Sequence, residues 1–119
     1  MASYQQYNFP DTLKGSYFVG TQFTLYSDVA QTIPIVLTGA TIEMAMKISE
    51  LSVSPDHLLS TFENTISITD AVNGVFQVVG QNMNVPAAEY FYDIKINFID
   101  GSHRIYIKGK WKILISVSG

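Results

Sequence analysis

The stretch from residue 89 to residue 117 constrains the fold of this chain most, because apolar and polar side chains alternate along it almost without a break. A period of two is typical of β-strands, whose successive side chains point to opposite faces of a sheet. Asp100-Gly101 interrupts the alternation, and this dipeptide accepts the positive φ angles of a tight hairpin turn. The pattern predicts an all-β fold with one long hairpin, its arms at 90–99 and 103–117.

Each arm of this hairpin presents one apolar face. The first face holds Tyr90, Tyr92, Ile94, Ile96 and Phe98, and the second holds Ile105, Ile107, Trp111, Ile113, Ile115 and Val117, with Gly109 keeping the register. Together with two residues from earlier strands, these faces predict a core. Its members are Ile42, Ile66, Ile94, Ile96, Ile107, Trp111 and Ile113.

Turn residues divide the rest of the chain into short strands. The predicted pieces are 15–26 (alternating at Tyr17, Val19, Phe23 and Leu25), the edge piece 33–37, 41–49 (Ile42, Met44, Met46 and Ile48 inward), 65–69, and 75–79 after Asn73-Gly74. A helix over 41–52 is the alternative there, and 57–62 is either a strand or a helical turn. This spacing predicts an Ig-like antiparallel β-sandwich over 15–119, preceded by an N-terminal arm over 1–14.

Composition bounds the class of protein. At 119 residues the chain forms one domain, and without cysteine it has no disulfide, thiolate nucleophile or cysteine metal site. No apolar run approaches the ~18 residues of a membrane span, and the first residues lack the pattern of a signal peptide. Only 14% of the residues are charged, against about 25% in an ordinary soluble domain. We therefore expect part of the surface to be covered by an obligate assembly.

The N-terminal arm carries three aromatic residues, Tyr4, Tyr7 and Phe9, but no strand pattern. Such side chains need burial, on this chain or on a neighbour. We expect them to contact another subunit. Deleting residues 2–12 should then leave a folded domain that no longer assembles.

Charge is unevenly spread along the chain. Residues 1–94 carry two lysines against nine acids, whereas residues 95–119 carry five basic residues against one acid. Lys108, Lys110 and Lys112 are spaced by two in a strand, so they share one face. This basic stripe either docks an acidic partner, or is a solvated face or a guarded edge strand. The protein as a whole is acidic, so nucleic-acid binding is not expected.

No pattern of catalytic residues is found in the sequence. His57 and His103 stand apart from other potential zinc ligands, and no glycine-rich phosphate loop follows a strand. Glu89 and Asp93 fall in an alternating strand with no cleft of exposed aromatic residues to make them a glycosidase pair. We predict a protein that is not an enzyme, with no cofactor, metal or small-molecule substrate.

Two local features predict fold determinants. Gly39 should take a backbone conformation that is closed to residues with a Cβ atom. Tyr90 or Tyr92 should bury its ring and hydrogen-bond its hydroxyl back to a loop, as tyrosines do at sandwich corners.

Three ordered patterns over residues 15–117 resemble a small Ig-like module of tailed-bacteriophage virion proteins, similar to the N-terminal module of siphophage upper-baseplate proteins. They are Ile35-Val36-Leu37-Thr38-Gly39-Ala40-Thr41-Ile42; Ile68-Thr69-Asp70 with Asn73-Gly74-Val75-Phe76; and Val85-Pro86-Ala87-Ala88-Glu89-Tyr90-Phe91-Tyr92-Asp93-Ile94, followed by Asp100-Gly101 and Lys108-Gly109-Lys110-Trp111-Lys112-Ile113. Ala88-Glu89 stand where the family often has glycine.

The resemblance implies a structural role without catalytic residues. It points to a virion structural or assembly protein (capsid decoration, neck, tail or baseplate), made in the host cytoplasm and acting through contacts with copies of itself or other virion proteins. The alternative is an independent binding module, such as an adhesin or a carbohydrate-binding domain. Sugar binding would need an exposed platform built from two or three of Tyr4, Tyr7, Tyr26, Tyr106 and Trp111.

Overall fold

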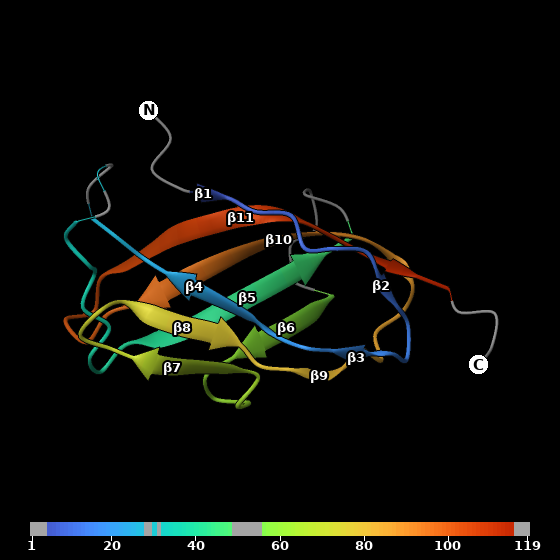
Figure 1. Ribbon diagram of the computed structural model, residues 1–119, viewed down its shortest axis with the longest axis horizontal. Helices are drawn as coiled ribbons and strands as arrows, with labels where there is room; N and C mark the ends of the chain where they lie inside the picture. Colours follow the sequence, from blue (N-terminus) through green and yellow to red (C-terminus); the bar gives the residue numbers. More distant parts are fainter. Residues whose placement is uncertain (1–4, 28–29, 31, 49–55, 116–119) are drawn as a thin grey trace.

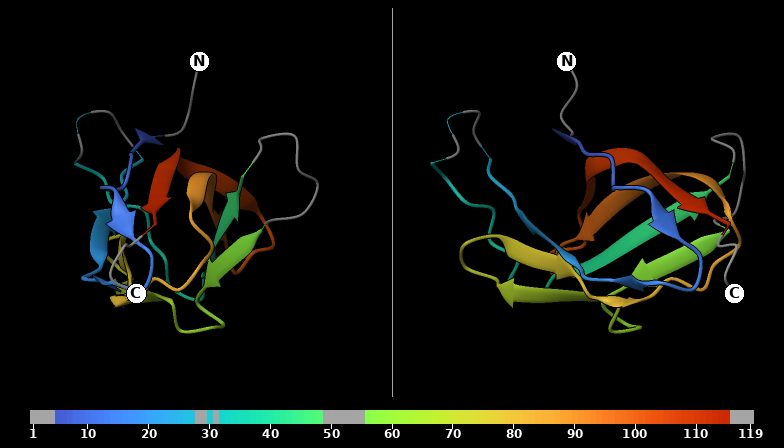
Figure 2. Two further views of the ribbon diagram at one scale, coloured as in Figure 1. Left: turned by 90° about the vertical axis from the view of Figure 1, so that its right-hand side faces the viewer. Right: turned by 45° about the vertical axis from the view of Figure 1, so that its right-hand side comes forward.

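A computed structural model describes residues 5–27, 30, 32–48 and 56–115. The described chain contains strands, turns and loops, and its two main sheets pack face to face (Figures 1 and 2). The larger sheet has the order β1-β11-β10-β5-β6, and β2 also pairs with β11. The smaller one has the order β4-β8-β7, and β3 pairs with β9 beside it. The all-β sandwich is confirmed.

The strands have the following bounds. The larger sheet contains β1 (Gln5–Gln6), β2 (Thr12–Leu13), β5 (Thr41–Lys47), β6 (His57–Ser60), β10 (Ala88–Asn97) and β11 (His103–Leu114). The smaller sheet contains β4 (Thr21–Thr24), β7 (Ile66–Asp70) and β8 (Val75–Val78), and the short pair consists of β3 (Tyr17–Phe18) and β9 (Gln81–Asn82).

The predicted hairpin is confirmed, because β10 and β11 pair antiparallel from Ala88↔Ile113 to Asn97↔His103. Its turn is slightly longer than a two-residue loop. Gly101 N–H donates to the Phe98 carbonyl (3.0 Å), Phe98 N–H donates to Ser102 (2.8 Å), and Gly101 has φ 93°. This is the geometry of a three-residue loop in which only the glycine is left-handed.

Strand order and one tyrosine identify the sandwich as Ig-like. The strand order β11-β10-β5 in one sheet and β4-β8-β7 in the other matches the G-F-C and B-E-D sheets of that fold. Tyr90, near the start of β10, is buried, and its hydroxyl donates to the Pro86 carbonyl four residues upstream (2.7 Å). The predicted tyrosine corner is thereby confirmed.

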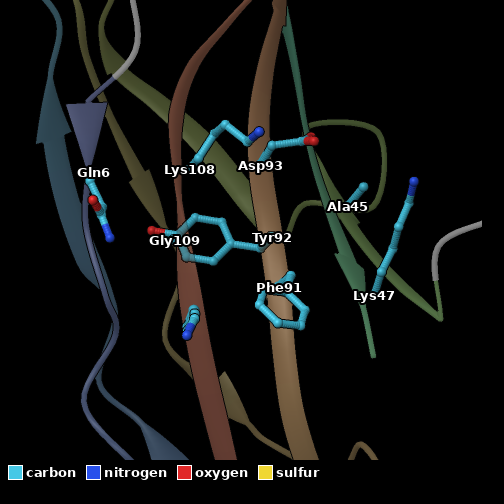
Figure 3. A pocket seen from close by; sticks show the side chains of 9 residues that line it. Gln6, Ala45, Lys47, Phe91, Tyr92, Asp93, Lys108 and Gly109 are labelled. Atoms are coloured by element: carbon cyan, nitrogen blue, oxygen red, sulfur yellow. The ribbon is translucent and has the colours of Figure 1, made fainter. Parts of the chain in front are cut away.

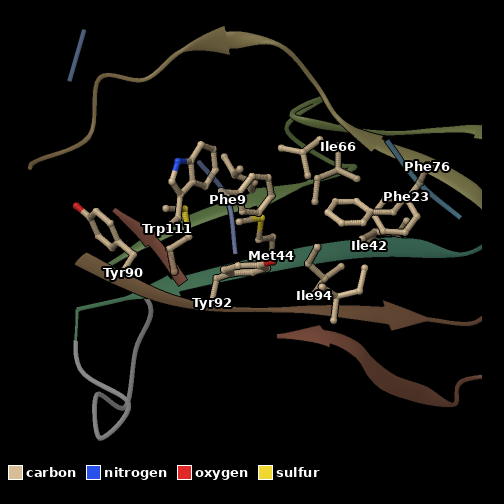
Figure 4. Close-up of a cluster of buried hydrophobic side chains, with 14 of the residues drawn as sticks. Phe9, Phe23, Ile42, Met44, Ile66, Phe76, Tyr90, Tyr92, Ile94 and Trp111 are labelled. Carbon is tan, nitrogen blue, oxygen red and sulfur yellow. The ribbon is translucent and has the colours of Figure 1, made fainter. Parts of the chain in front are cut away.

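The core lies between the two main sheets (Figure 4). All seven residues predicted for it are 0–2% exposed. Strand β5 runs through its centre and places Met44 and Met46 inward, so the helical alternative is wrong over Thr41–Lys47, and residues 49–55 lie outside the described residues. Gly39, just before β5, has φ 75°, as predicted.

Inward positions differ from the simple alternation at two places within the strands. Phe18 is buried whereas Tyr17 and Val19 are exposed, because Gly20 (φ 95°) separates β3 from β4 and shifts the pattern by one residue. A register shift in β11 sets Ile105 opposite Lys95, although Ile107 pairs with Ile94. Ile105 therefore turns away from the core face.

Two isoleucines predicted to lie inward are exposed at strand ends. Ile48 follows the last residue of β5, and Ile115 follows the last residue of β11. Both lie just beyond the last paired residue of their strands, where alternation alone does not bury a side chain. Val117 lies outside the described residues.

Candidate functional site

The N-terminal segment, residues 5–13, is bound along β11 instead of forming an irregular arm. Gln5 and Gln6 pair in parallel with Ile107 and Lys108. Thr12 and Leu13 pair in the same way with the end of β11. Between them, Phe9 N–H donates to a carbonyl of β11, at 3.0 Å. The alternation rule missed these pairings because two-residue strands are too short to show it.

Gly109 is the point at which this segment enters the sandwich. A Cβ atom on Gly109 would overlap the Tyr7 carbonyl oxygen, so only glycine lets the backbone of Tyr7 pass here. Tyr92, the cross-strand partner of Gly109, donates its hydroxyl to the same Tyr7 carbonyl. Burial of the Tyr92 ring raises its pKa, so its hydroxyl stays a hydrogen-bond donor.

Phe9 lies in the core of its own chain, 4% exposed. Its ring stacks on Trp111, with centroids 4.3 Å apart, and meets Tyr92 edge to face at 5.1 Å. Trp111 completes the arrangement by donating its ring N–H to the Thr12 hydroxyl (3.0 Å). The expectation that Phe9 contacts another subunit is therefore wrong: its apolar surface is already covered.

The other two aromatic residues of the segment differ. Tyr7 is half-buried and packs edge to face against Phe9 and Phe23 of its own chain. Tyr4 lies outside the described residues. The one available signal for this arrangement was Gly109, a missing side chain in the middle of an otherwise apolar strand face.

The basic stripe lies on the solvent face of the larger sheet, where Lys108, Lys110 and Lys112 are all exposed. Strand β11 is no free edge, because β10 flanks one side and β1 and β2 the other. Guarding an edge is therefore not the role of these lysines. Across the ladder they face Asp93, Phe91 and Glu89, respectively, and the Lys110 ammonium lies 5.5 Å from the Phe91 ring centre.

A shallow hollow of about 280 Å³ opens on this solvent face (Figure 3). We call it the Phe91 depression. It is lined from β1, β5, β10 and β11 by Gln6, Ala45, Lys47, Phe91, Tyr92, Asp93, Lys108, Gly109 and Lys110. The Phe91 ring is thus set among cationic side chains, whose aliphatic stems can cover apolar surface.

A second surface was not anticipated from the sequence. Four aliphatic side chains, Ile33, Val36, Val72 and Ile99, are exposed by 57%, 55%, 64% and 80%. They come from three connections, β4–β5, β7–β8 and β10–β11, which gather at one end of the sandwich (Figure 1). We call this surface the apolar loop end.

Backbone contacts hold the three connections of the apolar loop end together. Leu37 N–H donates to the Ala71 carbonyl (2.8 Å), which ties the β4–β5 connection to the β7–β8 turn. Further along the same connection, a Cβ on Gly39 would lie 2.7 Å from the Ile99 side chain, so these two residues are in contact. Val36 directly precedes Leu37, so it lies beside the attachment to the β7–β8 turn.

The chemistry of the described residues is sparse. They hold no group of three His, Cys, Asp or Glu side chains that would bind a metal ion. Partial burial lowers the pKa of His57, which favours the neutral imidazole. Across the ladder, Glu89 and Asp93 each face a lysine. In the described part of the chain, no helix is long and apolar enough to cross a membrane.

Comparison with known proteins gives no relative to set beside this site. No protein-family model, no curated protein and no solved structure matches the chain.

Proposed function

We propose that this chain is a non-enzymatic structural protein that acts through contacts with other protein chains. The apolar loop end carries the proposal. Exposed aliphatic residues that gather on one surface are typical of protein–protein contacts, because covering them releases water from apolar surface. Loop tips usually carry polar residues or glycine, so Val72 and Ile99 at two adjacent tips favour a contact role over a purely local one.

The particle in which it assembles is proposed to be the virion of a tailed phage or prophage. The three patterns that resemble the phage module coincide with fold determinants of this chain. Gly39 turns the chain into β5, Asn73-Gly74 closes the β7–β8 turn, and Pro86 accepts the tyrosine-corner bond. A capsid-decoration, neck, tail or baseplate component fits these features, made in the host cytoplasm, with copies of itself or other virion proteins as partners.

The alternative, a carbohydrate-binding module, has less support. Sugars stack on exposed aromatic rings with polar neighbours, but Trp111 is fully buried and Tyr106 packs against Phe98. Tyr26 is 36% exposed. Among the five candidate aromatic residues, Tyr26 is therefore the only exposed one in the described part of the chain, and a sugar-binding platform needs two or three.

Co-sedimentation tests the proposal. A tagged chain, expressed in a host that produces tailed particles, should sediment with the particles through a density gradient. An Ile99→Arg variant should stay at the top of the gradient, and Val19→Arg should follow the wild type, because Val19 is equally exposed but lies in the β3–β4 connection. Wild-type protein found only at the top, or binding to a glycan array, would contradict the proposal.

A further inference from the structure

The β7–β8 and β10–β11 turns have the same construction. In each, an N–H of the last residue, Gly74 or Gly101, donates to the carbonyl three residues earlier, and the glycine has a positive φ of 71° or 93°. Val72 and Ile99 occupy the second position, where a side chain points away from the sheet. Ile99 protrudes most, at 80% exposure, and its turn is fixed, because Asp100 accepts bonds from Ser102 N–H and Oγ at 2.9 and 2.6 Å.

Charge at the apolar loop end is acidic. Segments 33–39, 70–74 and 98–102 together contain Asp70 and Asp100 and no lysine or arginine. The hydroxyl and N–H of Ser102 lower the pKa of Asp100, so its carboxylate is ionised at neutral pH. Two loop ends brought together would place carboxylates opposite carboxylates. A partner with cationic groups around an apolar centre fits this surface better than a second loop end does.

The Phe91 depression has that composition. Its apolar centre is the Phe91 ring, beside the Lys110 ammonium, and its lining carries three lysines (Lys47, Lys108 and Lys110) against one carboxylate, Asp93. At about 280 Å³ it falls below the ~300–1,000 Å³ of pockets that enclose a small-molecule ligand. It is open on a flat sheet face, where a protruding loop tip can reach it.

We propose that the Ile99 tip of one copy of this chain seats in the Phe91 depression of a second copy, with Asp100 beside the lysines. This inference rests on the proposed assembly function and names its partner. The loop end lies at one end of the sandwich and the depression on its broad face, so a single copy can use both at once (Figures 1 and 3). Such a contact joins unlike surfaces, and repetition closes a ring or extends a filament.

Solution mass over a concentration series, by light scattering after size exclusion, tests the contact. The wild type should form oligomers that weaken as salt rises, because exposed charge pairs are screened. Ile99→Arg and Lys110→Glu should each raise the dissociation constant about tenfold or more, as expected for a central contact residue. Val19→Arg and Lys112→Glu are the matched controls, since Lys112 lies on the same face outside the depression.

Mixing the two variants gives the sharpest result. The Lys110→Glu copy keeps its loop end and the Ile99→Arg copy keeps its depression, so an equimolar mixture should form a 1:1 dimer that cannot grow. Circular dichroism of each variant checks that the fold is intact, and both side chains are exposed enough for it to persist.

Two outcomes would overturn the inference: a wild type that stays monomeric up to about 1 mM, the weak end of specific association, or a mixture that contains only monomers. The proposed function fails separately, when the wild type does not sediment with particles. A monomeric wild type that still joins particles would remove only the self-contact.

Discussion

The N-terminal segment and the apolar loop end both carry large apolar side chains, but the first buries Phe9 and the second exposes Ile99 to solvent. Both place large apolar residues outside the long strands, yet Phe9 is 4% exposed and Ile99 is 80% exposed. The difference lies in what each segment meets. Gly109 leaves room on the inner face of β11, and the N-terminal segment fills it. Buried apolar residues such as Phe9 should stabilise the fold. Exposed ones such as Ile99 should matter only for contacts with other chains.

Removing residues 2–12 should give the largest effect on the N-terminal side of this comparison. The truncation uncovers Trp111 and Tyr92 and removes the Thr12 hydroxyl that accepts the indole N–H. We expect a loss of about 5 kcal/mol or more, comparable to the whole stability of a small domain. Urea titration against the full chain measures it. A cooperative transition within about 1 kcal/mol of the full chain would restore the expectation of a dispensable arm.

Phe9→Ala should lower the free energy of unfolding by about 3–5 kcal/mol, the usual cost of emptying a buried aromatic site. Trp111 is the sole tryptophan and stacks on Phe9, so its fluorescence reports the transition directly. Val19→Ala, at an exposed position, serves as the control and should stay near the wild type. A cost below about 1 kcal/mol would show that the stacked ring contributes little.

Gly109→Ala should cost about 1–3 kcal/mol through overpacking, because its methyl group would overlap the Tyr7 carbonyl. Lys110→Ala, one residue on and facing solvent, is the matched control. Differential scanning calorimetry of the two variants compares their melting temperatures, and only Gly109→Ala should melt below the wild type. Equal melting temperatures would mean that the N-terminal segment does not need the space above Gly109.

Tyr92→Phe should cost about 1 kcal/mol, since it removes one hydrogen bond and leaves the Tyr7 carbonyl without that donor. Tyr17→Phe is the control, because the Tyr17 side chain is exposed. Chemical denaturation of the two variants resolves the difference. If Tyr92→Phe left the free energy of unfolding unchanged, ring packing alone would account for the attachment of the segment.

Ile99→Ser should change stability by less than about 0.5 kcal/mol, the smallest effect in the series, because the side chain is already in water. Its thermal unfolding should overlay that of the wild type. A clear loss of stability would mean that Ile99 supports Gly39 and its connection, and the comparison with Phe9 would weaken accordingly.

Long alternating strands and turn residues allowed much of this fold to be predicted. The hairpin, all seven core residues, the left-handed Gly39 and the tyrosine corner follow from local patterns, because each depends on residues near one another in the sequence. Alternation failed where one residue changed the phase: Gly20 turned Phe18 inward, and the register shift in β11 turned Ile105 outward.

The candidate surfaces were harder to predict. The lysine stripe was found, since its residues share one strand, but the Phe91 depression combines four strands. The apolar loop end combines three connections, with Val36 and Ile99 more than sixty positions apart, so no window of sequence contains it. Phe9 was assigned to a partner for the same reason: its neighbour Trp111 lies at the far end of the sequence.

The attachment at Gly109 also sets the order of folding events. The bond between Asn8 and Lys110 spans 102 residues, and that between Trp111 and Thr12 spans 99. At about 5–20 residues per second, a ribosome needs about 5–20 s to make the intervening chain. The N-terminal segment is made before β11 and must therefore wait for that strand, and its docking closes one of the largest loops in the chain. High contact order of this kind slows folding to about milliseconds or seconds, so we expect the aromatic ring of Phe9 to be among the last to leave water.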